Sequence, residues 1–150
     1  MKIEGSHTFE ASREEVWRAL LDPKVISRTL PGCDELQKVG ENQYKGTLRV
    51  GVGSIQGQFD GSVSLSDLNP LESYHIKLKG KGAPGFLEGE GKIWLEEQGL
   101  STILHYDITA FVGGRVASVG QRLLESTARV ITRQALKRFQ QEIKKGAMKI

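Results

Sequence analysis

Apolar and polar residues alternate over most of the first 112 positions of the chain, which is the pattern of half-buried strands. Residues 2–10 alternate in this way, and six further alternating segments lie between residues 34 and 112. Turns such as Gly40-Glu41-Asn42 and Asn69-Pro70 separate those six segments. Short connections between successive strands are typical of an antiparallel meander, so the pattern predicts seven antiparallel strands.

Two short helices are predicted between the first strand and the second. Ser12 lies three residues before Glu15, which is the capping-box spacing at a helix start. Asp22-Pro23 ends this helix and can begin another, because proline is tolerated in a first helical turn. The break at Leu30-Pro31-Gly32-Cys33 then returns the chain to strands.

After Gly113-Gly114 the spacing of apolar residues changes from every second residue, typical of strands, to every third or fourth residue, typical of a helix. From Arg115 to about Lys145 the sequence has no proline and one glycine, Gly120, and a helix of about 30 residues would be about 45 Å long. Such a helix must lie across the rest of the fold. The residues expected on its packing face are Val116, Val119, Leu123, Leu124, Thr127, Val130 and Ile131.

The last turns of this helix present a different apolar side. Leu136, Phe139 and Ile143 are the apolar residues beyond Arg133, and their register is shifted from that of the first half. They are expected to contact the N-terminal helices, with a partner chain or a membrane surface as the alternative.

The predicted order of elements is one strand, two short helices, six strands and a long helix. This order predicts an α+β fold. The economical arrangement is a seven-stranded, curved antiparallel sheet that wraps around the C-terminal helix, because one helix remains to cover the apolar face of every strand. A chain of 150 residues is expected to form a single domain over residues 1–150.

Glycine is frequent and falls where a core would favour Val or Ile. The chain has 18 glycines among 150 residues, against about 7% in average proteins. Glycines in strands mark bends or close approaches of other groups. Missing side chains on an inner face also favour a cavity for an apolar ligand. The inward glycines are predicted to be Gly5, Gly46, Gly57, Gly61, Gly80, Gly89 and Gly91.

The net charge of +3 hides an asymmetry between the long helix and the rest. Residues 1–112 hold 12 basic and 16 acidic side chains, whereas residues 113–150 hold nine basic side chains against Glu125 and Glu142. A basic helix suits an anionic membrane surface or an acidic partner, or simply solvates an outer face. Interleaved aromatics are lacking, so no nucleic-acid partner is expected. The nine are Arg115, Arg122, Arg129, Arg133, Lys137, Arg138, Lys144, Lys145 and Lys149.

Signals for catalysis or metal binding are weak. His7, His75 and His105 are scattered without metal-ligand spacing, and Cys33 is the only cysteine. No nucleophile elbow or phosphate-binding loop is found, so no catalytic residue, metal or cofactor is predicted, and a binding module is favoured over an enzyme. His7 lies on the same strand face as Ile3, so it is expected to be either a core histidine or a polar contact in a cavity.

Without an apolar run of 18 residues or the apolar core of a signal peptide, a cytoplasmic location is the default expectation.

Several short motifs resemble one family over nearly the whole chain. The sequence is similar to the carbon monoxide dehydrogenase G-subunit family, of the START-like helix-grip superfamily shared with birch pollen allergen. The motifs are Phe9-Glu10-Ala11 with Glu15-Val16-Trp17, Leu21-Asp22-Pro23, Leu30-Pro31-Gly32-Cys33, Val50-Gly51-Val52-Gly53, Ile55-Gln56-Gly57-Gln58-Phe59-Asp60-Gly61, Val112-Gly113-Gly114-Arg115-Val116-Ala117 and Gly120-Gln121-Arg122-Leu123.

The resemblance implies an apolar cavity between the helix and the sheet, and association with a molybdenum hydroxylase of the carbon monoxide dehydrogenase type. Roles implied are recruitment of that enzyme to the membrane and binding of a quinone or another lipid. Many relatives carry a Pro/Ala-rich tail and a hydrophobic anchor, which this sequence lacks up to Ile150. The expectation is therefore a carrier or adaptor whose membrane contact, at the inner face, is peripheral and runs through the basic helix.

The predicted function is binding of a lipid or quinone in that cavity. Tyr106 and Thr127 are expected to orient a polar head. Two alternatives stay open: a polyketide cyclase-like enzyme using His7, Tyr44, Tyr74 or Tyr106, and a protein adaptor with a filled core. The predicted lining residues are Leu48, Phe59, Leu78, Leu87, Tyr106, Ile108, Val119, Leu123 and Thr127.

Overall fold

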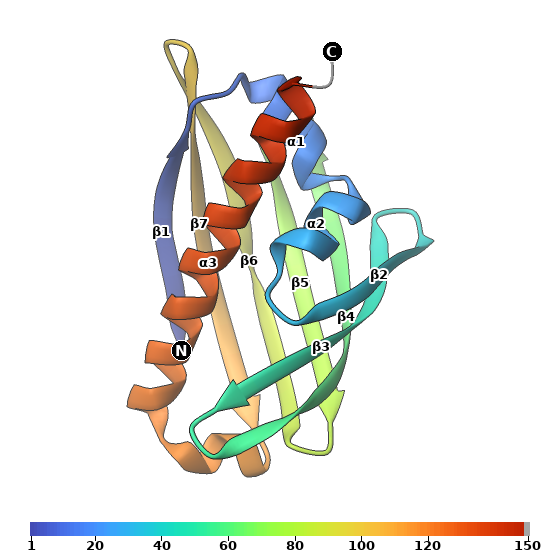
Figure 1. Cartoon of the computed structure of the whole chain (residues 1–150), viewed down its shortest axis with the longest axis vertical. Helices are drawn as coiled ribbons and strands as arrows, with labels where there is room; N and C mark the ends of the chain where they lie inside the picture. Colours follow the sequence, from blue (N-terminus) through green and yellow to red (C-terminus); the bar gives the residue numbers. More distant parts are fainter. Residues whose placement is uncertain (149–150) are drawn as a thin grey trace.

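A curved antiparallel sheet and three α-helices on one side of it make up the computed structural model, which describes residues 1–148 (Figure 1). The strand order is β1-β7-β6-β5-β4-β3-β2, so each strand from β2 to β7 pairs with its neighbour in sequence, and β1 closes on β7. The elements are β1 (Lys2–Phe9), α1 (Arg13–Leu20), α2 (Pro23–Thr29), β2 (Cys33–Gly40), β3 (Gln43–Val52), β4 (Ile55–Asn69), β5 (Ser73–Gly82), β6 (Gly85–Gln98), β7 (Ser101–Gly113), a 3₁₀ helix η1 (Arg115–Val119) and α3 (Gln121–Met148).

The predicted α+β helix-grip architecture is confirmed. Figure 1 shows α3 lying across the concave side of the sheet, with α1 and α2 on that same side. The predicted caps are present as well: the Ser12 hydroxyl accepts a hydrogen bond from the Glu15 N–H at 3.2 Å, and the Asp22 carboxylate accepts from the Lys24 N–H at 2.9 Å.

The long helix begins six residues later than predicted. Arg115–Val119 form the separate turn η1, and Gly120, with φ 98° and ψ 151°, interrupts the chain before α3 starts at Gln121. Only glycine adopts that backbone conformation readily. A 3₁₀ turn also advances the chain by about 120° per residue rather than 100°. The register of Val116 therefore does not continue into α3.

Two packed clusters border the space between α3 and the sheet. The larger one holds Phe9, Val16, Trp17, Phe139 and Ile143 and lies beneath α1 and the end of α3. The smaller one, formed by Val52, Phe59 and Val116 with their neighbours, lies near η1. The fully buried Pro84 belongs to the β5–β6 turn, and its carbonyl accepts a 2.7 Å hydrogen bond from the Val116 N–H.

Candidate functional site

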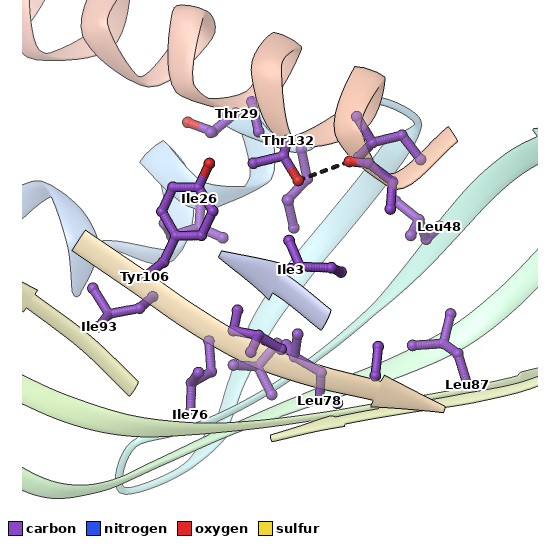
Figure 2. A pocket seen from close by; sticks show the side chains of 18 of the residues that line it. Ile3, Ile26, Thr29, Leu48, Ile76, Leu78, Leu87, Ile93, Tyr106 and Thr132 are labelled. Carbon is purple, nitrogen blue, oxygen red and sulfur yellow. Dashed lines mark hydrogen bonds between the residues drawn. The ribbon is translucent and has the colours of Figure 1, made fainter. Parts of the chain in front are cut away.

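A cavity of about 430 Å³ lies between α3 and the sheet, bordered at one end by the larger cluster and at the other by the smaller one. Its sheet wall includes Ile3, Ile76, Leu78 and Leu87, which come from strands far apart in the sequence (Figure 2). The short helix α2 contributes Ile26 to the lining on the helix side. None of the described residues that line this space has a charged side chain. The cavity is thus an apolar compartment with hydroxyls as its only polar side-chain groups.

Small residues on α3 explain why the space stays open. Four of the eight α3 residues that line the cavity are small. These are Thr127, Ala128, Thr132 and Ala135, and they lie among the larger Leu124, Ile131, Leu136 and Phe139 on the same helix face. The sheet opposite has ordinary core residues such as Ile76 and Leu78. The missing volume is therefore largely on the helix side, and α2 supplies further lining that the sequence interpretation missed.

The structure places seven of the nine predicted lining residues on the cavity wall: Leu48, Phe59, Leu78, Leu87, Tyr106, Ile108 and Thr127. Val119 and Leu123 are not among the residues that line it. Val119 packs with the smaller cluster, and Leu123 is 39% exposed with its methyl group against Gly53 of the β3–β4 hairpin. Val130, expected on the packing face, is 45% exposed. The interruption at Gly120 accounts for this change of register.

The inward glycines mostly serve close packing rather than empty space. A methyl group added to Gly5 would lie 2.6 Å from the Tyr106 hydroxyl, and one at Gly57 would lie 2.2 Å from the Pro84 ring. Of the seven glycines predicted to face inward, Gly89 alone is among the described residues lining the cavity. Both explanations of the glycines therefore apply, but close approach is the main one.

Three of the six side-chain hydroxyls that line the cavity donate to main-chain carbonyls. The Thr29 and Thr132 side chains donate to carbonyls one helical turn earlier, at 2.7 and 2.8 Å. The Tyr44 hydroxyl donates to the Leu21 carbonyl at 3.4 Å. Tyr106 instead rises from β7 toward the helices and borders the open space (Figure 2).

The buried phenols of this region cannot act as bases near neutral pH. Burial, and the nearby Tyr44 phenol, hold the pKa of Tyr74 far above its ordinary value. Burial and the charge of Asp22 also raise the pKa of Tyr44. Both side chains stay protonated, so they can donate hydrogen bonds but not remove protons.

His7 does not line the cavity. Its Nε2 atom lies 3.0 Å from Gln140 Oε1 on α3, and its ring packs 4.6 Å from the ring of Phe9. His7 therefore lies at the packing interface between β1 and α3. This placement removes the one imidazole that the cyclase interpretation needed inside the cavity.

The other histidines lie away from the cavity and pair with carboxylates. His75 and His105 lie 2.9 and 3.3 Å from Glu90 and Glu96, respectively. The hydrogen bond from His75 and the charge of Lys77 lower the pKa of Glu90. Among the described residues no group of three His, Cys, Asp or Glu side chains could hold a metal ion.

The end of α3 packs inside the molecule. Phe139 is 3% exposed and contacts Phe9 edge to face at 5.3 Å, and Ile143 is 7% exposed. The contact with the N-terminal elements is the one expected first, and it leaves these side chains unavailable to a partner chain. The adaptor alternative also required a filled core, whereas a cavity is present.

The part of the chain that the structure describes contains no helix long and apolar enough to cross a membrane. Lys149, counted among the basic residues of the C-terminal segment, lies outside the described residues.

Comparison with known proteins agrees with this architecture. The family model for the carbon monoxide dehydrogenase G-subunit (CoxG) matches residues 5–144. No curated protein matches the chain. The crystal structure of a conserved protein from Geobacillus kaustophilus superposes with a TM-score of 0.92 at 36% identity, covering 97% of this chain and 96% of the other.

More distant structures share the fold. A START superfamily protein from Mycobacterium smegmatis has a TM-score of 0.73 at 13% identity, with 96% of this chain and 97% of that one covered. The Zhui aromatase/cyclase from Streptomyces sp. R1128 has a TM-score of 0.66 at 15% identity, with 96% and 93% covered. At these identities the likeness shows the START-like fold alone.

Proposed function

The chain belongs to the CoxG family of carbon monoxide dehydrogenase, and from this premise we propose that it binds an uncharged apolar molecule, a lipid or a quinone, beneath α3. The protein would act as an accessory binding protein rather than an enzyme. The observation that carries the proposal is the 430 Å³ space, whose lining has no charged side chain.

The apolar wall of the cavity favours an occupant. The space is half open, so part of its apolar wall faces solvent. Water covers such a wall poorly, because each ordered water needs two to four polar partners and the wall offers few. An apolar ligand would remove this wall and its own surface from water, which contributes about 25 cal/mol per Å² of buried apolar area.

The polar groups at the wall restrict the ligand class. Tyr106 and Thr127 present hydroxyls, and the described lining residues include no lysine, arginine or histidine to neutralise a buried carboxylate or phosphate. The N-terminal ammonium of Met1, which also borders the space, donates to the Ala110 carbonyl at 2.9 Å. The ligand is therefore a molecule whose buried part is neutral, with a carbonyl or ether oxygen able to accept a hydrogen bond from Tyr106. Quinones and neutral lipids meet this description.

Mass spectrometry of the purified protein tests the proposal. Under native conditions the expected spectrum contains a species heavier than the polypeptide by one small molecule, and solvent extraction should recover that molecule as a neutral lipid or quinone. The control is protein extracted with solvent and refolded, which should bind added decylubiquinone in a 1:1 ratio. Failure of both the native and the refolded protein to hold any apolar molecule would contradict the proposal.

The partner we propose is a molybdenum hydroxylase of the carbon monoxide dehydrogenase type, and the basic outer face of α3 would make the contact, to the enzyme or to an anionic membrane. Arg122, Arg129 and Arg133 are exposed there, beside the exposed apolar side chains Leu123 and Val130.

Capture of such a hydroxylase by the wild type, but not by the Arg129→Glu/Arg133→Glu variant, would support the contact. Sedimentation with vesicles containing phosphatidylserine, compared with neutral vesicles, would separate the two partners. Equal capture and equal sedimentation of wild type and variant would exclude this face.

A further inference from the structure

The phenols of the cavity gather at one of its ends. All three tyrosines of the chain, Tyr44, Tyr74 and Tyr106, line the space. Tyr44 and Tyr74 belong to the larger cluster, and Tyr106 packs against it. The smaller cluster, at the other end, contributes only apolar side chains to the lining. The cavity therefore has a phenol-bearing end and an apolar end, which is the asymmetry that orients an amphipathic molecule.

Tyr74 is the most deeply buried of the three phenols and has no partner within the part of the chain that the structure describes. The residue is 3% exposed, and no hydrogen bond joins its hydroxyl to another described residue. The one described side-chain polar atom that lacks both a partner and accessible surface is Arg13 Nε. The Tyr74 hydroxyl therefore keeps some accessible surface, and because the residue lines the cavity, that surface faces the cavity.

An unpartnered buried phenol favours a ligand that carries an acceptor atom. A buried donor without an acceptor costs free energy, and the large majority of buried polar groups in proteins are paired. The packing of Tyr74 on Trp17, with ring centroids 5.7 Å apart, involves the ring and would be kept by phenylalanine. Burial and the nearby Tyr44 raise the pKa of Tyr74, so its hydroxyl stays protonated near neutral pH and can donate.

The sheet register places Tyr74 and Tyr106 on either side of Ile93. Tyr74 pairs with Ile93 across β5 and β6, and Ile93 pairs with Tyr106 across β6 and β7. Neighbouring strands lie about 4.8 Å apart, so the two tyrosine Cα atoms lie about 10 Å apart. Figure 2 shows Ile93 and Tyr106 next to each other on the cavity wall. A flat ring over Ile93 can therefore meet one phenol at each side.

We propose that Tyr74 is the inner anchor of the bound molecule and sets its orientation. The inference rests on the proposed binding function and deepens it. The Tyr74 hydroxyl donates to an uncharged oxygen of a flat head group that lies over Ile93, and Tyr106 meets the other side of that group. The apolar chain of the ligand runs along Leu78 and Leu87 toward the smaller cluster. The ligand class is thus a neutral ring that carries acceptor oxygens and an apolar tail, and a plain hydrocarbon is a poorer ligand.

Titration with two compounds that share one chain measures the hydrogen bond. Decylubiquinone has oxygens on its ring, whereas decylbenzene has the same chain on a ring without oxygen. In delipidated protein Tyr74→Phe should weaken decylubiquinone binding by about two- to tenfold, the ratio that corresponds to one net hydrogen bond. Decylbenzene is the matched control, because a change in the shape of the cavity would affect both compounds, and its binding should be unchanged.

Fluorescence of Trp17 tests the orientation independently. The chain has two tryptophans, and Trp94, which stacks on His105 with ring centroids 5.2 Å apart, does not line the cavity. The Trp94→Phe variant therefore keeps the cavity wall and leaves Trp17, beside Tyr74, as the only tryptophan. Quinone rings quench tryptophan emission by electron transfer at short range. Saturating decylubiquinone should strongly quench Trp17 in this variant.

Urea unfolding at pH 7 checks the premise, because a hydroxyl without a protein partner contributes no hydrogen bond to folding. Tyr74→Phe should be at least as stable as the wild type, and a clear loss of stability would show a protein partner and overturn the inference. Equal decylubiquinone affinities of wild type and Tyr74→Phe, equal losses toward both compounds, or unquenched Trp17 would also overturn it while leaving the binding function intact. If neither compound binds the wild type, the binding function fails instead.

Discussion

The two halves of α3 meet the same sheet with different side chains. Toward the C-terminus, Phe139 and Ile143 fill the space beneath the helix and pack on Phe9 and Trp17. Nearer its start, the helix presents the small residues Thr127 and Ala128 among larger ones such as Ile131, and a cavity remains. The C-terminal half of α3 is thus packed in the core, whereas its N-terminal half covers the cavity.

Residue size along one helix face accounts for this difference. Small residues, Thr127, Ala128, Thr132 and Ala135, make up half of the eight α3 residues that line the cavity, whereas Phe139 and Ile143 belong to the larger cluster, with Leu136 packed against it. Protein interiors are otherwise close-packed, so the small side chains opposite an ordinary sheet surface leave unfilled volume, which is the basis of the proposed binding site. The following variants change one half and not the other.

The largest expected effect comes from truncating the packed half. Ile143→Ala removes a side chain that is 7% exposed inside the larger cluster and does not border the cavity, so it should cost about 2–5 kcal/mol of unfolding free energy. Ile131→Ala makes the same change on the same helix, but over the cavity. It should cost clearly less in delipidated protein, because Ile131 already lacks neighbours on one side. Urea unfolding measures both, and equal losses would contradict the comparison.

Alkaline pH should weaken the packed side through Tyr74, whose ring lies tilted against the Trp17 ring with the two centroids 5.7 Å apart. Its pKa is raised in the folded protein, whereas the unfolded chain has the ordinary value near 10. Below about pH 10 both states are protonated and stability is full. Above it the unfolded state loses its proton first, so stability falls by about 1.4 kcal/mol per pH unit until the folded phenol titrates. Tyr74→Phe should lose less stability than the wild type between pH 10 and the folded pKa, and identical pH profiles would argue against this burial.

Filling the hollow half should stabilise it. Ala135→Leu adds apolar volume toward the cavity and is expected to raise the unfolding free energy of delipidated protein by about 0.5–2 kcal/mol. Ser126→Leu, on the exposed face of the same helix, is the control and should change stability by less than about 0.5 kcal/mol. A loss of stability in Ala135→Leu like that of an overpacked core would mean that the space is already filled.

The smallest expected effect concerns the polar head of the ligand. Tyr106→Phe removes one hydroxyl from the cavity wall and should weaken decylubiquinone binding by about 0.5–1.5 kcal/mol, the net value of one hydrogen bond. Binding of N-phenyl-1-naphthylamine, which has no carbonyl, should be unchanged. Calorimetric titration with both compounds measures the difference. Equal weakening of both would assign Tyr106 a packing role only.

The order of elements and the caps could be predicted because they depend on local pattern. Alternation identified the strands, and Ser12 and Asp22 identified the helix starts. Which face of α3 borders the cavity was only partly predictable. The turn at Gly120 shifts the helical register, and a rule based on regular spacing of apolar residues does not detect such a shift. Leu123 was therefore placed inward, and Ala128 and Ala135 were missed. The small residues at helical spacing were a usable signal, whereas the conspicuous glycines chiefly reflect close contacts such as that of Gly5 with Tyr106.

The most direct test of the central claim compares binding in the plugged and unplugged protein. The Ala128→Leu/Ala135→Leu variant fills the roof of the cavity, and Ser126→Leu adds the same bulk outside it. Titration with decylubiquinone should show one site in the wild type and in Ser126→Leu, and an affinity at least about tenfold weaker in the plugged variant. Undiminished binding by a folded plugged variant would contradict the claim that the space beneath α3 is the binding site.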